Sequence, residues 1–95
     1  MTAIILWLLG MFSPIASLFI IFPHPEEPLK IAACESHFDN SQVGDAGELS
    51  FMQIHPIHFD YYNPKLLKLL PIYAAMAAWE LSGRGKNYQP WEGCR

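Results

Sequence analysis

The first 25 residues of the chain contain no Asp, Glu, Lys or Arg. Residues 1–22 are nearly all apolar, and a helix needs roughly 20 apolar residues to cross a bilayer. A cleaved signal peptide is the alternative, but such peptides normally begin with basic residues, and the first basic residue here is Lys30. The sequence therefore predicts that residues 1–22 form a transmembrane or signal-anchor helix, with a cleaved segment as the alternative.

Positive charge is scarce in the rest of the chain as well. There are six Lys and Arg residues, and the formal net charge is −3. The basic residues are scattered rather than gathered into a stripe, which argues against a nucleic-acid partner. No basic cluster follows residues 1–22 to hold the downstream part in the cytoplasm. We therefore expect that part to be exported.

Cysteine is also scarce, because the chain has only Cys34 and Cys94. Two cysteines in a small exported domain are typical of one disulfide. The alternative is one buried thiol and one thiol near the end of the sequence. The expected folded part, residues 29–95, is small enough to benefit from such a cross-link.

Proline and glycine divide the remaining sequence into segments. Three prolines within residues 23–28 predict an extended linker, and residues 29–38 should form a helix with Glu26 and Glu27 near its positive end. Residues 39–50 are polar and predict a loop. The aromatic segment 51–62 is compatible with a short strand or with helical turns.

The last predicted helix begins at Asn63-Pro64, a cap residue followed by proline at the first helical position. It should run to a stop at Gly83, with a kink at Pro71 and with Trp79 in the core. An irregular tail follows. The fold class predicted from these segments is mainly α.

Glu35 interrupts the apolar face of the first of these helices. Ile31, Glu35 and Phe38 are spaced four and three apart, so they share one face. A carboxyl on an apolar face should have a raised pKa, because burial disfavours the charged form. A carboxyl that stays protonated can donate a proton to a leaving oxygen, as glycoside cleavage requires. The alternative is a structural Glu at the rim of the core.

Three motifs together resemble the lysozyme-like soluble lytic transglycosylase family and the related goose-type lysozymes. They are Glu35-Ser36 at a helix end, Phe51-Met52-Gln53-Ile54 after a glycine-containing loop, and a tail with Trp91 and Cys94 in a Trp-x-x-Cys arrangement. The resemblance covers residues 29–95. It implies a minimal lysozyme-like domain that cleaves the β-1,4 bond between N-acetylmuramic acid and N-acetylglucosamine in peptidoglycan.

The resemblance assigns the catalytic acid to Glu35. It implies that this group protonates the glycosidic oxygen and then acts as a base toward the muramoyl 6-hydroxyl or water. It also matches Gln53 to a glutamine in the substrate cleft, with a turn-stabilising role as the alternative. Aromatic rings near the cleft could stack on sugars. The predicted substrate-binding residues are Ser36, Glu48, Gln53, Tyr61, Tyr88 and Trp91.

The expected partners are peptidoglycan strands and, through residues 1–22, the cytoplasmic membrane, with the domain facing the cell wall or exported if the segment is cleaved. We expect a monomer without a cofactor. His55, His58 and Asp60 raise the question of a metal site. Pro56 makes a regular helix there unfavourable, so no metal site is predicted.

Two positions depart from the family pattern. Ser50 stands where the family usually has Gly, and Ser fits there only with a negative φ or tolerated strain. Glu48 stands where the family often has Ser, and it is a possible second carboxylate. The Ala-Tyr-Asn segment found in many of these enzymes is missing, with Tyr73 and Tyr88 as its nearest substitutes. The alternative function is a non-catalytic peptidoglycan-binding or envelope-assembly module, and a weaker one is a small membrane protein that contacts a partner.

Overall fold

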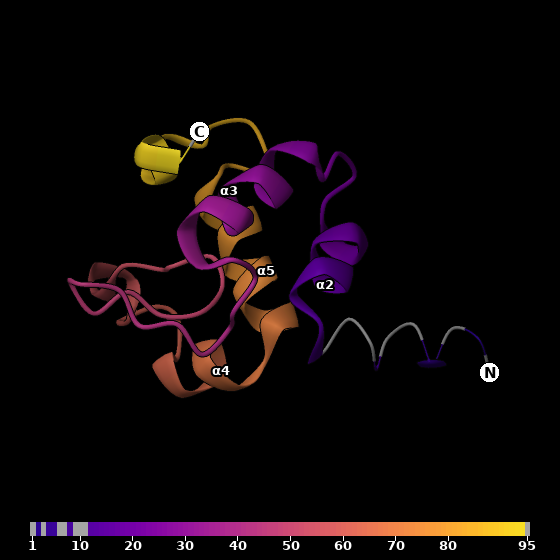
Figure 1. Cartoon of the computed structure of the whole chain (residues 1–95), viewed down its shortest axis with the longest axis horizontal. Coiled ribbons are helices and arrows are strands. Elements are labelled where there is room, and N and C mark those ends of the chain that lie inside the picture. The colour runs from indigo at the N-terminus through magenta and orange to yellow at the C-terminus, as the bar shows by residue number, and fades with distance from the viewer. Residues whose placement is uncertain (1, 3, 6–7, 9–11, 95) are drawn as a thin grey trace.

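The protein is a small helical domain. A computed structural model describes residues 2, 4–5, 8 and 12–94 (Figure 1). The described helices are, in chain order, α2 (Pro14–Ile21), α3 (Glu26–Ser36), η1 (Pro56–His58), α4 (Pro64–Leu69), α5 (Pro71–Leu81) and η2 (Gln89–Cys94). In this part of the chain β structure is limited to the isolated bridges Val43–Leu49 and Leu49–Ile54. The mainly α prediction is confirmed.

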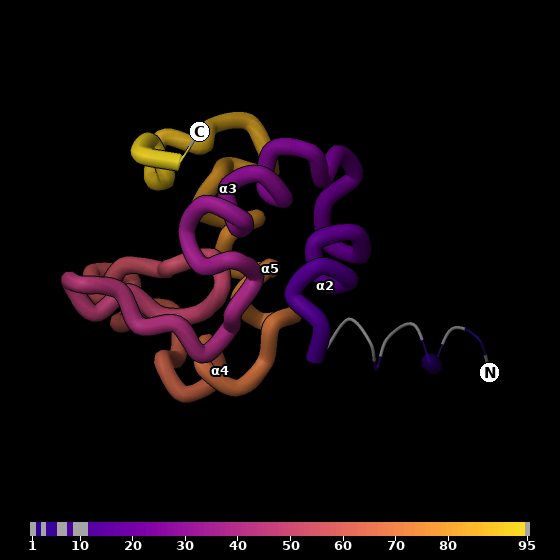
Figure 2. The backbone as a smooth tube through the Cα atoms, viewed as in Figure 1, coloured from indigo at the N-terminus to yellow at the C-terminus, as the bar shows by residue number. Residues whose placement is uncertain are grey.

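The core is built around α5. This helix carries four fully buried alanines, Ala74, Ala75, Ala77 and Ala78. Small side chains let neighbouring helices approach closely, and α2 packs against α5 with Leu18 fully buried. On α3, Ile31 and Ala32 are buried in the same cluster. Figure 2 shows the loop after α3 on one side of this helical body and α2 on the other.

One face of α2, within the predicted anchor segment, belongs to this core, whereas other described apolar side chains of the segment, among them Phe12 and Phe19, are exposed. Ser17, Leu18 and Phe22 are buried, and the Phe22 ring lies edge-on to Trp79 at 5.1 Å between centroids. These side chains therefore face protein, and the packed unit begins before residue 29. None of the helices in the described ranges has the length and apolarity needed to cross a bilayer. The rest of the predicted segment, residues 1, 3, 6–7 and 9–11, lies outside the described residues.

The first helix of the predicted domain starts three residues earlier than the sequence indicates. α3 begins at Glu26, so the linker is shorter than residues 23–28. Pro28 is tolerated because the N–H groups in the first turn of a helix have no carbonyl partner within the helix, so the N–H that proline lacks costs no hydrogen bond. Glu26 and Glu27 occupy that turn, where their charge favours the positive end of the helix dipole. At the other end His37 adopts the left-handed conformation, with φ 53°.

The predicted long helix after Asn63 is two helices. Asn63 caps α4 as predicted, because its Oδ1 accepts the N–H groups of Lys65 and Leu66. The prediction of one kinked helix is wrong, since Leu70 is extended (φ −121°, ψ 105°) and separates α4 from α5. Proline disfavours the helical conformation in the residue before it, so Pro71 ends one helix and begins the next.

The segments 39–55 and 83–88 differ from the helical body in having little regular structure. Segment 39–55 forms a folded loop that includes the two isolated bridges. The tail is more ordered than predicted, because residues Gln89–Cys94 form η2, two short 3-10 turns that meet at the non-helical Trp91. A disulfide joins Cys34 to Cys94, with the Cα atoms 5.6 Å apart. The predicted cross-link is present, and it attaches the tail to α3.

Candidate functional site

The Glu35 carboxyl lies at the C-terminal end of α3, one residue before the helix ends. The side chain is half-buried. Burial raises the pKa of this carboxyl above its ordinary value of 4.5, and the negative charge of Glu48 raises it further. Both effects favour the protonated form.

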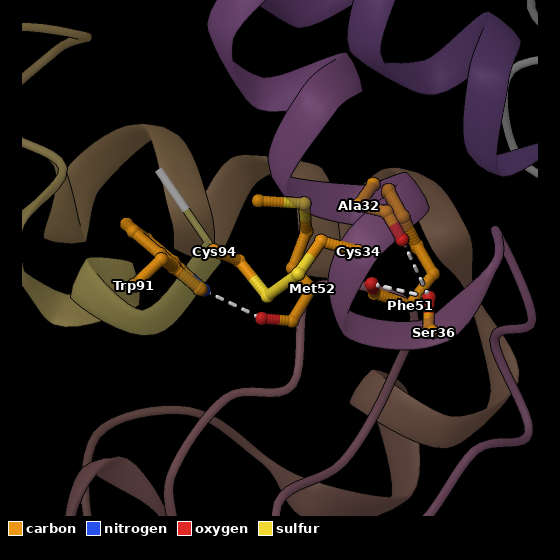
Figure 3. Close-up of a disulfide and its surroundings, with 7 residues drawn as sticks. All are labelled: Ala32, Cys34, Ser36, Phe51, Met52, Trp91 and Cys94. Atoms are coloured by element: carbon orange, nitrogen blue, oxygen red, sulfur yellow. Dashed lines mark hydrogen bonds between the residues drawn. A yellow bond between two sulfur atoms is a disulfide. The ribbon is translucent and has the colours of Figure 1, made fainter.

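Ser36 fixes the end of α3 to the Phe51–Ile54 segment. Its buried Oγ donates to the carbonyl oxygen of Phe51 at 2.6 Å and lies 3.2 Å from that of Ala32 (Figure 3). The predicted role of Ser36 was substrate binding. Its hydroxyl is instead engaged with backbone, and it sets the position of Glu35 relative to the loop.

The tail holds the same segment from the opposite side. The indole Nε1 of Trp91 donates to the carbonyl oxygen of Met52 at 2.6 Å. In Figure 3 the Cys34–Cys94 disulfide lies beside this hydrogen bond, with the Ser36–Phe51 hydrogen bond close by. The three sequence motifs, which are far apart in the chain, are therefore in direct contact. Two successive carbonyls, those of Phe51 and Met52, accept hydrogen bonds from side chains of two motifs.

Gln53 serves mainly as a turn-stabilising residue. Its Nε2 donates to the backbone oxygens of Gln42, at 3.0 Å, and Ser50, at 2.8 Å. Both amide hydrogens are thereby used within the loop. The side-chain oxygen is the atom of Gln53 that can accept a hydrogen bond from a sugar amide or hydroxyl. Gln53 also borders a cavity of about 260 Å³ that extends to Trp91.

Glu48 is positioned by the turn that precedes it. Its backbone oxygen accepts the Gly44 N–H at 2.9 Å, and its Oε1 accepts the Ala46 N–H at 2.9 Å. A side chain at Gly44 would collide with the carboxylate of Glu48 and the amide oxygen of Gln53. Glycine at this position therefore lets both side chains fold back over the loop.

Ser50 stands where the family usually has Gly, and of the two possibilities for a serine there, a negative φ or a strained backbone, the structure shows the strained one. Its φ is 76°, in the left-handed region that glycine adopts readily. The residue is fully buried, and its Oγ accepts the Met52 N–H at 3.2 Å. This local hydrogen bond offsets part of the conformational cost, which is of the order of 1–2 kcal/mol.

The aromatic residues predicted to stack on sugars occupy different environments. Tyr61 is 78% exposed, so its ring is accessible. Tyr88 and Trp91 are only 7% and 3% exposed, which makes them core residues with little ring surface at the outside of the protein. Tyr62 is also buried, and its hydroxyl donates to Glu80 at 2.7 Å. The stacking role predicted for Tyr88 and Trp91 thus has no support from the structure.

Asn40 is a positioning residue that the sequence did not single out. Its Oδ1 accepts the Phe51 N–H at 3.1 Å, and its Nδ2 donates to the carbonyls of Leu67 and Lys68. It therefore joins the Phe51–Ile54 segment to the end of α4. The signal in the sequence, one Asn in a polar loop, is too common to identify such a role.

His55, one of the residues considered for a metal site, has a structural role. His55 caps η1, with its Nδ1 accepting the Ile57 N–H at 3.1 Å. Across the described ranges, three or more metal-ligating side chains do not come together.

Comparisons with protein-family models, curated proteins and solved structures found no match to this chain.

Proposed function

We propose that this protein cleaves peptidoglycan glycan strands at the β-1,4 bond between N-acetylmuramic acid and N-acetylglucosamine. It would act as a lytic transglycosylase or a muramidase, on a minimal lysozyme-like fold. The observation that carries the proposal is the half-buried Glu35 carboxyl, whose pKa is raised by burial and by Glu48. A protonated carboxyl beside a segment with polar groups for a sugar is the basic requirement of acid-catalysed glycoside cleavage.

In the proposed reaction Glu35 donates its proton to the glycosidic oxygen as the bond from that oxygen to C1 breaks. The resulting Glu35 carboxylate then serves as a base. If it removes the proton of the muramoyl 6-hydroxyl, that oxygen closes on C1 and gives a 1,6-anhydro sugar. If water attacks C1 instead, the product is a reducing sugar.

The contacts among the three motifs support this assignment. Ser36 ties the end of α3 to the carbonyl of Phe51, and Trp91 ties the tail to the carbonyl of Met52. These contacts place the Gln53 segment next to the helix end that carries Glu35. The residues behind the resemblance to the lytic transglycosylase family therefore form one connected unit.

The Cys34–Cys94 disulfide supports a place of action outside the cytoplasm, because such bonds persist in oxidising compartments. Peptidoglycan strands lie in that compartment. We propose that the domain faces the cell wall, attached to the cytoplasmic membrane or exported.

The test is the release of soluble muropeptides from purified insoluble peptidoglycan by the full chain and by Glu35→Gln. The substitution keeps the shape and removes the proton donor, so release should fall by about 100-fold or more. Glu92→Gln is the matched control, because Glu92 is an exposed acid on η2 and should leave the rate at the parent level. Equal release by the parent and by Glu35→Gln would refute the assignment.

The strained Ser50 favours a second candidate, a peptidoglycan-binding or envelope-assembly module that has lost catalysis. A serine with φ 76° in place of glycine is compatible with a site no longer optimised for turnover. Binding to insoluble peptidoglycan in a pull-down, with no soluble product, would select this alternative.

A further inference from the structure

The outward side of α2 (Pro14–Ile21) is apolar and exposed. At about 3.6 residues per turn, Ser17 and Leu18 lie on one side of this helix, and Ile15, Phe19 and Ile20 lie on the other. The first side packs against α5, and both of its residues are fully buried. On the second side Phe19 is 61% exposed, and Ile15 and Ile20 are exposed as well. One helix therefore has an apolar face in the core and a second apolar face outside it.

Exposed apolar side chains continue ahead of α2. Phe12, two residues before the helix, is 63% exposed, and Ile4, Ile5 and Leu8 are also exposed. More than half of the large apolar side chains that are exposed in the described ranges belong to residues 4–20. Single exposed apolar side chains are ordinary, whereas a group of them marks a place where a protein meets another protein or a membrane.

The polar side chains of α2 and of its cap are engaged within the helix itself. The segment 12–22 has two of them, Ser13 and Ser17. The Ser13 Oγ accepts the Ala16 N–H at 3.2 Å, and the Ser17 Oγ donates to the Pro14 carbonyl oxygen at 2.8 Å. Protein interfaces combine an apolar centre with a polar rim and direct hydrogen bonds, and the outward face of α2 has no side chain that could supply them. A hydrocarbon phase makes the opposite demand, since polar groups must find their partners within the segment that enters it. The chemistry of this face therefore matches lipid.

Charged side chains contribute nothing to this face. Residues 1–25 contain no Asp, Glu, Lys or Arg. The first acidic residues along the chain, Glu26 and Glu27 on α3, would repel anionic lipid rather than attract it. Basic residues draw proteins to anionic headgroups, and salt screens that attraction. An attachment made by α2 depends on apolar contact instead, so it should be insensitive to salt and to the charge of the lipid.

We propose that the outward face of α2, together with Phe12, binds the surface of a phospholipid bilayer and holds the helical domain against it. Such binding does not depend on the proposed glycan cleavage, and it selects the membrane-attached location over the freely exported one. The loop after α3, which includes the Phe51–Ile54 segment, lies on the side of the helical body opposite to α2 (Figure 2). Docking through α2 therefore directs that loop away from the bilayer.

The first test is photocrosslinking of the full chain to phosphatidylcholine vesicles, with Phe19 replaced by the photoreactive benzoylphenylalanine. We expect mass spectrometry to find a lipid adduct on the peptide that contains position 19. Leu69, which is 65% exposed on α4, is the matched position, and the same probe there should give no lipid adduct. A cross-link from position 19 to a second copy of the chain, or the lack of a lipid adduct there, would overturn the proposal.

Vesicle flotation measures the strength of the attachment. The full chain should float equally well with phosphatidylcholine vesicles and with vesicles that also contain phosphatidylglycerol, in about 0.1 M and about 1 M NaCl. Phe12→Ser/Phe19→Ser should lower the partition coefficient about 100-fold, because burying one such ring is worth roughly a factor of 10. Leu69→Ser is the control and should leave the partition coefficient unchanged. Binding that high salt abolishes, or that the double variant keeps in full, would refute contact through α2.

The design separates this attachment from folding and from catalysis. Both phenylalanines are exposed, so the double variant should unfold at the parent urea midpoint, and if it does not, the adduct at position 19 decides the question alone. Vesicle binding is measured without peptidoglycan, so its failure leaves the proposed glycan cleavage intact. A chain that binds vesicles and releases no muropeptides would refute the cleavage and support the attachment.

Discussion

Removal of the Cys34–Cys94 disulfide is the perturbation whose size follows most directly from the structure. The two cysteines are 60 residues apart in sequence. In the chain-entropy treatment, closing a loop of that length removes roughly 14 cal/mol/K from the unfolded chain, or about 4 kcal/mol at 25 °C. A domain of this size is typically stable by about 5–15 kcal/mol. The cross-link therefore supplies a large part of the stability.

The variant is Cys34→Ser/Cys94→Ser, with both thiols replaced so that none is left to form dimers. Urea unfolding, followed by circular dichroism, should show the free energy of unfolding falling by about 4 kcal/mol. The dependence on urea should become steeper, because an uncross-linked chain exposes more surface when it unfolds. In thermal scans the midpoint should fall by more than about 15 °C.

The tail provides the control for this experiment. Trp91→Phe keeps the disulfide and removes the hydrogen bond to the Met52 carbonyl, so its cost should be about 1–3 kcal/mol, without a steeper urea dependence. A loss below about 1 kcal/mol in the double serine variant would refute the entropic reasoning. So would an unchanged urea slope.

Three further predictions concern the site itself. Ser50→Gly should be about 1 kcal/mol more stable than Ser50→Ala in urea unfolding, because both lose the hydroxyl and only glycine relieves the positive φ; equal stability would contradict the strain. Because its pKa is raised, Glu35 makes the native state bind a proton more tightly than the unfolded chain, so stability should fall as pH rises above about 4.5. Glu35→Gln should therefore have a higher free energy of unfolding than the parent at neutral pH, and the difference should be smaller below pH 4.5. Urea midpoints measured at both pH values test this, and a difference that does not change with pH would argue against burial of the charge. Gly44→Ala should slow muropeptide release, because the added Cβ collides with the side chains of Glu48 and Gln53. Gly93→Ala is the control, because an added Cβ there meets nothing within 4 Å. Equal release rates for the two variants would contradict the effect of this collision.

Features with a local cause were predictable from the sequence. Asn63 and Pro64 begin α4 as the capping pattern indicates, and Glu35 is half-buried as its helical spacing suggests. Two cysteines in a small domain pair with each other. In each case the deciding interaction lies within a few residues, or the number of possible partners is very small.

Features decided by distant residues were not predictable. The burial of Leu18 depends on α5, a helix more than 50 residues later, so an apolar run that fits a membrane is also compatible with a protein core. Trp91 is buried because its indole meets Met52, 39 residues away. Periodicity gives no information about such pairs. The separation of α4 from α5 has a local cause, because Pro71 disfavours the helical conformation at Leu70; the prediction of a kink underestimated that effect.

The two carbonyls of Phe51 and Met52 also bear on when the site is assembled. The Phe51 carbonyl is bonded to Ser36, which is synthesised 15 residues earlier. The Met52 carbonyl is bonded to Trp91, which is synthesised 39 residues later. During synthesis the acid-bearing helix therefore emerges well before the tail that completes its surroundings. The Cys34–Cys94 bond then has to be oxidised. The surroundings of Glu35 are therefore complete only after the tail has been made and the Cys34–Cys94 bond has formed, so the proposed glycan cleavage would begin only at that point.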